Sequence, residues 1–136
     1  MADISWGLRA RTLLARAGFR PQHSLGQNFL LDDDVLEHLI DLSGVGPDDH
    51  VLEIGPGPGV MTRLLAGRVR RVTAVEIDRA LEPVLSEMLS GVENAEVNFA
   101  AERATVFLRT DAGKPEAMPP DVATLIAAVE EAGFEA

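Results

Sequence analysis

The sequence contains no cysteine and no tyrosine, and only one of its 136 residues is tryptophan. The absence of cysteine excludes disulfides, thiolate metal sites and cysteine nucleophiles among these residues. No apolar run approaches the roughly 18 residues that a membrane span needs, and the first residues lack the basic and then apolar pattern of a signal peptide. We therefore expect a cytoplasmic protein without a membrane partner.

Basic residues are also scarce. The chain has 12 lysines and arginines against 22 acidic residues, for a net charge of −10. A nucleic-acid-binding protein normally presents a basic face, because neutralising phosphates supplies much of the affinity. Only the N-terminal arm offers one, and a solvated basic helix explains its arginines equally well. The acidic remainder argues against tight RNA binding by this chain alone. The arm carries Arg9, Arg11, Arg16 and Arg20.

The middle of the chain predicts a parallel α/β unit. Two helical segments come first, at residues 7–17 and from Asp32–Asp34 onward, separated by an ordered loop at 22–31. A strand–glycine turn–helix–strand–helix pattern then follows, which is typical of a parallel sheet with crossover helices. Its parts are a strand at Val51–Ile54, a turn at Gly55–Gly59, a helix from Val60, a strand at Arg71–Ile77 and a helix capped by Asp78.

The pattern changes after Gly91. Residues 95–100 and 103–108 predict two short strands paired as a hairpin, and an amphipathic helix runs from Val122 to Gly133. We therefore expect one α/β domain with four main strands and one continuous core. The predicted core comprises Leu36, Ile40, Val51, Ile54, Leu64, Val75, Leu85, Val97, Val106, Ile126 and Val129.

The glycine turn between the first strand and its helix is the most informative stretch. Glycines at this place let the backbone approach a ligand where a Cβ would collide, and ligands of open α/β sheets bind beside such turns. Glu76 follows Gly57 by 19 residues and ends the next strand. An acid about 20 residues past the glycines is the usual partner of a cofactor ribose. The alternative is a structural turn with Glu76 solvated or ion-paired to Arg70 or Arg71.

Three segments closely resemble the rRNA adenine dimethyltransferase family, with matching order and spacing from about residue 8 to residue 91. They are Ser24-Leu25-Gly26-Gln27-Asn28-Phe29-Leu30, Val51-Leu52-Glu53-Ile54-Gly55-Pro56-Gly57 and Val75-Glu76-Ile77-Asp78. The resemblance implies S-adenosylmethionine as cofactor and rRNA as substrate. It implies that Asn28 and Leu30 contact the methionine end of the cofactor. Gly55 and Gly57 would line its path, and Glu76 would hold the ribose.

One part of that family's pattern has no counterpart here. The family places Asn-Leu-Pro-Tyr or Asn-Leu-Pro-Phe after its fourth strand, where it holds the target amine and stacks the flipped base. The nearest string is Met118-Pro119-Pro120-Asp121, which has neither an amide nor an aromatic ring. Glu102 falls near a further cofactor-binding acid of the family, but we assign it no role. We predict no catalytic residue, and a protein incomplete for methyl transfer.

The tail has a second resemblance. Residues 91–106 and 121–134 are similar to the middle and the last helix of heavy-metal-associated domains, which are small ferredoxin-like modules. That family holds its metal with two cysteines, which are absent here. The three histidines are scattered without ligand spacing, so we expect no metal site. We interpret the chain as a Rossmann-like methyltransferase front at 1–91, continued by a ferredoxin-like hairpin and helix at 92–136 in the same domain.

Three hypotheses for function follow. The first is an S-adenosylmethionine-binding protein of the dimethyltransferase type. The second is a non-catalytic module like the heavy-metal-associated domains, in which the glycine turn is vestigial. The third is a chimera without a function beyond folding. Cofactor binding separates the first hypothesis from the other two.

Overall fold

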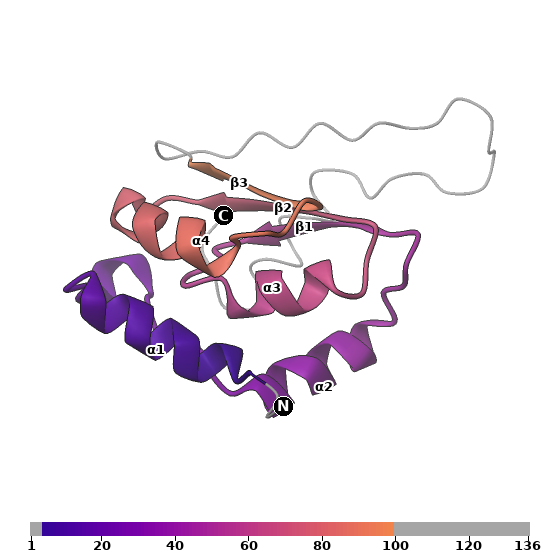
Figure 1. Cartoon of the computed structure of the whole chain (residues 1–136), viewed down its shortest axis with the longest axis horizontal. Coiled ribbons are helices and arrows are strands. Elements are labelled where there is room, and N and C mark those ends of the chain that lie inside the picture. Colours follow the sequence, from indigo (N-terminus) through magenta and orange to yellow (C-terminus); the bar gives the residue numbers. More distant parts are fainter. Residues whose placement is uncertain (1–3, 100–136) are drawn as a thin grey trace. The chain divides into compact units, whose positions relative to one another are not determined.

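The computed structural model describes residues 4–99. These residues form helices and strands in the alternating order that the sequence pattern predicts (Figure 1). In chain order they are α1 (Trp6–Arg16), the 3-10 helix η1 (His23–Leu25), α2 (Asp33–Ser43), β1 (His50–Ile54), α3 (Val60–Ala66), β2 (Arg71–Glu76), the 3-10 helix η2 (Arg79–Leu81), α4 (Glu82–Met88) and β3 (Ala95–Phe99).

The three described strands form one parallel sheet in the order β1-β2-β3. Val72 in the central strand pairs with Val51 on one side and with Ala95 on the other. The parallel pairing of β1 with β2 confirms the α/β prediction. β3 also lies parallel to β2, whereas the hairpin partner predicted for it, at residues 103–108, falls outside the described residues.

Short polar side chains cap the first turns of α1 and α2. The Ser5 hydroxyl accepts a hydrogen bond from the Leu8 N–H at 3.2 Å, and the Asp32 carboxylate accepts one from the Val35 N–H at 3.1 Å. These caps satisfy backbone donors that a first helical turn otherwise leaves unpaired. Asp78 also acts as a cap, but the segment that it starts is first a 3-10 turn and only then α4.

The core lies between the sheet and the helices on one of its faces. In Figure 1 the helices α1, α2 and α3 lie on one side of the strands. One buried cluster joins α1, α2, α3 and α4, and a second joins α2 and α3 to the strands. The first comprises Ala10, Leu13, Leu36, Val60, Val84 and Met88, and the second comprises Ile40, Leu65, Val69 and Val72.

The predicted core is confirmed at three helix positions and wrong at one strand position. Leu36, Ile40 and Leu85 are buried, but Ile54 is 66% exposed. Side chains alternate between the two faces of a strand, and Ile54 points to the face opposite Glu53, away from the helices. Val51, Leu64, Val75 and Val97 are partly buried. Val106, Ile126 and Val129 lie outside the described residues.

The two N-terminal helices are joined by one carboxylate. Asp33, at the start of α2, accepts hydrogen bonds from the backbone N–H groups of Trp6 and Gly7 at 2.7 and 2.6 Å. Gly7 leaves no room for a side chain, because a Cβ there would lie 1.8 Å from the Leu31 carbonyl oxygen. The first turn of α1 therefore rests directly on the backbone that leads into α2. Within residues 4–99, no helix is long and apolar enough to cross a membrane.

We expect Asp33→Ala to lower the free energy of unfolding by about 1–3 kcal/mol, because two backbone donors lose a charged acceptor. Asp34→Ala is the matched control, since it removes a carboxylate from the same first turn of α2 and makes no hydrogen bond to α1. Urea denaturation followed by circular dichroism measures both. Equal losses in the two variants would show that the bonds to Trp6 and Gly7 contribute nothing.

Candidate functional site

The glycine turn connects the carboxyl end of β1 to the first turn of α3. Gly55, Gly57 and Gly59 all have positive φ, at +72°, +56° and +87°. This left-handed conformation is disfavoured by any side chain with a Cβ, which explains the Gly-x-Gly-x-Gly spacing. The turn also continues the sheet, because the Gly55 N–H donates to the Val75 carbonyl at 2.9 Å.

Glu76 ends β2 beside this turn and is 4% exposed. One carboxylate oxygen, Oε2, accepts the Gly57 N–H at 3.1 Å. The other, Oε1, accepts the N–H groups of Ile77 and Asp78, both at 2.9 Å. Within residues 4–99 Glu76 is therefore shielded from solvent and makes no ion pair, and Arg71 pairs with Glu96 at 3.0 Å instead. The acid joins the two loops that follow β1 and β2.

The loop at residues 22–31 meets the glycine turn through Phe29. A Cβ added to Gly57 would lie 2.9 Å from the Cδ1 atom of the Phe29 ring, so glycine is required for this contact. The Phe29 ring also packs against Phe19, with ring centroids 5.8 Å apart. A segment some 28 residues earlier in the chain is thereby brought to the end of β1.

The structure brings together some of the predicted site residues. Gly57 and Glu76 share a hydrogen bond, and Gly55 is exposed at the end of β1. Asn28 and Leu30 flank Phe29 and are exposed, Leu30 by 48%. The five residues therefore belong to two loops and one strand end that meet at the carboxyl edge of the sheet.

A second acid, Glu53, lies next to Glu76 and was not predicted to have a role. The Thr62 hydroxyl donates to Glu53 Oε2 at 2.6 Å. Burial raises the pKa of Glu53 above its ordinary value, the bond from Thr62 opposes this rise, and the nearby Glu76 charge adds to it. Among residues 4–99, no lysine or arginine pairs with either acid. In the sequence, only the position of Glu53 within the Leu52-Glu53-Ile54-Gly55 segment could have indicated a role for it.

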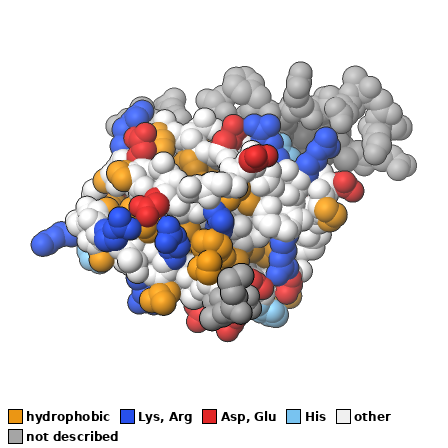
Figure 2. Space-filling view, in the orientation of Figure 1, with side chains coloured by type: hydrophobic (Ala, Val, Ile, Leu, Met, Phe, Trp, Pro, Cys, Tyr) orange, Lys and Arg blue, Asp and Glu red, His pale blue; other side chains and the backbone are white. Residues whose placement is uncertain are grey.

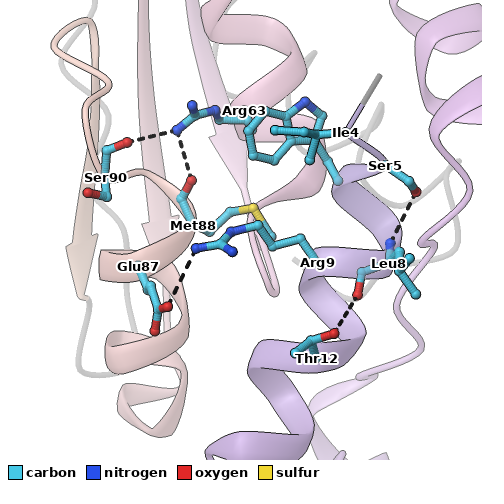
Figure 3. Close-up of a pocket in the computed structure, with 10 residues that line it drawn as sticks. Ile4, Ser5, Leu8, Arg9, Thr12, Arg63, Glu87, Met88 and Ser90 are labelled. Carbon is cyan, nitrogen blue, oxygen red and sulfur yellow. Dashed lines mark hydrogen bonds and ion pairs between the residues drawn. The ribbon is translucent and has the colours of Figure 1, made fainter. Parts of the chain in front are cut away.

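A separate hollow of about 670 Å³ lies between α1, α3 and α4 (Figure 3). The Arg63 guanidinium lies 4.2 Å from the centre of the Trp6 ring and donates to the carbonyls of Met88 and Ser90, each at 3.0 Å. These bonds satisfy carbonyls at the end of α4 and fasten the three helices together. None of the predicted site residues lines this hollow.

The described surface has no single charge sign. In Figure 2 arginine and acidic side chains are interspersed on the face shown, among the residues that the structure describes. On α1, Arg9 and Arg16 both pair with Glu87 of α4, at 3.5 and 3.2 Å. Residues 4–99 also contain no cluster of three or more histidine or acidic side chains that could hold a metal ion.

A family model described as ribosomal RNA adenine dimethylase matches residues 18–103. The chain belongs to this family. The match includes the Gly-Gln-Asn-Phe-Leu loop, the glycine turn and Glu76, which are the three segments that carry the resemblance seen in the sequence. It also continues through β3, which the sequence assigned to the second resemblance. Most of that tail lies outside the described residues.

Proteins named ribosomal RNA small subunit methyltransferase A are similar to the same part of the chain. The one from Deinococcus radiodurans is 52% identical over 85 residues, which are 62% of this chain and 29% of the relative. The one from Geobacillus thermodenitrificans is 43% identical over 95 residues, which are 70% of this chain and 32% of the relative. The chain thus spans about a third of the length of these dimethylase relatives.

Solved structures support the same assignment. The 23S rRNA methyltransferase ErmE has a TM-score of 0.50 and is 46% identical, covering 54% of this chain and 30% of its own. A dimethyladenosine transferase from Plasmodium falciparum has a TM-score of 0.53 and is 28% identical, covering 62% of this chain and 31% of its own. The described residues therefore have the Rossmann-like fold of the dimethylase family, as predicted.

Gly57→Ala should destabilise the protein more than Gly55→Ala. Both substitutions place a Cβ on a left-handed backbone, at a cost of about 1–2 kcal/mol. Gly55 has open space around it, whereas Gly57 faces Phe29, so Gly57→Ala should cost about 1 kcal/mol more. Thermal and urea denaturation test this ranking. The Gly57→Ala, Phe29→Ala double variant should lose less stability than the sum of the two single variants, because the clash with the ring is gone. A loss equal to that sum would contradict the contact.

Proposed function

We propose that this chain binds S-adenosylmethionine at the carboxyl edge of its sheet. The observation that carries the proposal is the buried Glu76 carboxylate, which is bonded to Gly57 of the glycine turn. This pairing joins the acid and the glycines whose spacing suggested a nucleoside cofactor. Membership of the dimethylase family supports the same cofactor.

The chemistry of the edge fits this cofactor. A carboxylate offers about four acceptor positions, and Glu76 uses three of them on backbone N–H groups. Acceptor capacity therefore remains for a ribose hydroxyl. The neighbouring Glu53 carboxyl adds oxygen acceptors near the same edge, which suits a ligand that carries an ammonium group. No Cβ occupies the open space at Gly55, so a ligand has access to the turn.

The proposed contacts follow from this placement. Glu76 holds the ribose, while Gly55 and Gly57 line the path of the cofactor. Asn28 and Leu30, on the loop anchored by Phe29, contact its methionine end. When bound, the cofactor supplies an electrophilic methyl group. The protein residues named here bind and orient it, and we assign none of them a catalytic role.

Methyl transfer to rRNA adenines needs more than these residues. The amine must be held in line with the methyl group, and the flipped base needs an aromatic face. The 136 residues include no Asn-Leu-Pro-Tyr or Asn-Leu-Pro-Phe string and no tyrosine. We therefore propose that these residues alone bind the cofactor without methylating rRNA.

Calorimetric titration with S-adenosylhomocysteine and S-adenosylmethionine tests the cofactor site. Glu76→Gln is preferable to Glu76→Ala, since alanine would leave three backbone donors without an acceptor. We expect Glu76→Gln to weaken cofactor binding about 10–100-fold, because the ribose hydroxyls lose a charged hydrogen-bond acceptor. Glu82→Gln, an exposed acid on α4, is the matched control and should bind like the unmodified chain.

Two results would oppose the proposal. The first is absence of binding up to millimolar ligand in protein shown to be folded. The motifs would then contribute to the fold without binding a cofactor, as the chimera hypothesis holds. Equal affinity in Glu76→Gln and the unmodified chain would mean that the ligand binds elsewhere.

We also propose a weak contact between the N-terminal arm and small-subunit rRNA. Arg9 and Arg16 are engaged by Glu87, whereas Arg11 and Arg20 are exposed and make no ion pair within residues 4–99. Arg11 and Arg20 are therefore the arm's available phosphate ligands. The net charge of −10 keeps this contact weak.

Replacing both Arg11 and Arg20 by alanine should weaken RNA binding and lower its salt dependence by about one counterion per arginine. Fluorescence anisotropy with a fragment from the 3′ end of small-subunit rRNA, at a series of salt concentrations, measures this. Arg70→Ala, at an exposed arginine before β2, is the control. An equal loss per arginine in the control would assign the effect to net charge alone.

A further inference from the structure

The side chain of Gln27 joins the loop at residues 22–31 to the end of β2. Its Nε2 atom donates to Asp78 Oδ2 at 2.6 Å, across 51 positions of sequence. Its Oε1 atom accepts the Gln22 N–H at 2.7 Å. Both ends of one amide are thus used, one to close the loop on itself and the other to hold it to the sheet.

Asp78 is built into the same network as the proposed ribose acid. It is 7% exposed, and its second oxygen, Oδ1, accepts the Ala80 N–H at 2.9 Å. Its own backbone N–H donates to Glu76 Oε1 at 2.9 Å. A continuous set of hydrogen bonds therefore runs from Glu76 through Asp78 to Gln27.

Asn28 and Leu30 depend on this attachment for their position. Both side chains are exposed, and the Asn28 side-chain amide makes no hydrogen bond within the described part of the chain. Gln27 precedes Asn28 and bonds to Asp78, while Phe29 follows it and packs on Gly57. The two neighbours of Asn28 are thus the anchors that hold it at the edge of the sheet.

We propose that Gln27 is a positioning residue for cofactor binding. Its hydrogen bond to Asp78 holds Asn28 and Leu30 where they meet the methionine end of the cofactor, while Glu76 takes the ribose. This proposal rests on the proposed function. Preorganising the loop raises affinity, because the ordering cost is met before the ligand arrives.

A charge swap separates this role from a general effect on folding. In Gln27→Glu a carboxylate faces the Asp78 carboxylate, so the donor is lost and two like charges meet. Adding Asp78→Asn reverses the bond, since the new amide can donate to Glu at position 27 and still accept the Ala80 N–H. The Glu carboxylate can also keep the bond from the Gln22 N–H.

The measurements are calorimetric affinity for S-adenosylhomocysteine and hydrogen exchange of residues 22–31 in cofactor-free protein. We expect Gln27→Glu to bind about tenfold more weakly and to lose protection in the loop, with little change in the melting temperature. The double variant should recover affinity to within about threefold. Gln22→Glu is the matched control, because it adds the same charge to the loop while leaving the Gln27–Asp78 bond intact.

The outcomes distinguish the two proposals. If the unmodified chain binds no ligand, the proposed function fails, and the positioning role fails with it. If the unmodified chain binds but Gln27→Glu binds equally well, only the positioning role is overturned. A double variant that folds, yet stays as weak as Gln27→Glu, also overturns it.

Discussion

The hydrogen bonds made by the Glu76 carboxylate are the interaction on which the rest of the site depends. A buried carboxylate without partners is costly, so its three backbone donors must stay in place. Those donors come from the glycine turn after β1 and from the segment after β2. The ends of two parallel strands are therefore held at fixed separation by one side chain. Within residues 4–99 backbone hydrogen bonds, and no basic residue, satisfy this carboxylate.

The N-terminal segment is attached to the rest of the described residues by several contacts, two of which reach this edge of the sheet. Asp33 holds the start of α1, Arg63 ties α1 to α3 and α4, and Phe29 and Gln27 hold the loop between α1 and α2. The contacts of Asp33, Trp6, Phe29 and Gln27 each pair a residue before β1 with a partner remote in sequence. The loop that carries Asn28 and Leu30 is consequently part of the same unit as the sheet. The family match at residues 18–103 includes both the loop and the glycine turn.

The described helices cover one face of the described sheet, and the apolar side chains of the two faces differ in exposure accordingly. On the covered face Val72 and Ala74 are fully buried, whereas Leu52 and Ile54 on the other face are 43% and 66% exposed. Parallel sheets are usually covered on both faces, which accounts for the apolar side chains of Leu52 and Ile54 on the face that the described helices leave open.

The sequence by itself determined the local elements and the family. The helix cap at Asp32, the strand at Val51–Ile54 and the glycine turn follow from nearest-neighbour chemistry, which acts over a few residues. The Ser5 cap of α1 was not predicted and appeared only in the structure. The tertiary structure alone decided which face of each strand meets the helices. Ile54, which we predicted in the core, is therefore exposed. It also paired Gln27 with Asp78 and enclosed Glu53 beside Glu76, because such contacts join residues with no periodic relation in the chain. Sequence spacing suggested that Gly57 and Glu76 would meet, since parallel strands end at one edge, but only the packing of Phe29 showed how the earlier loop reaches them.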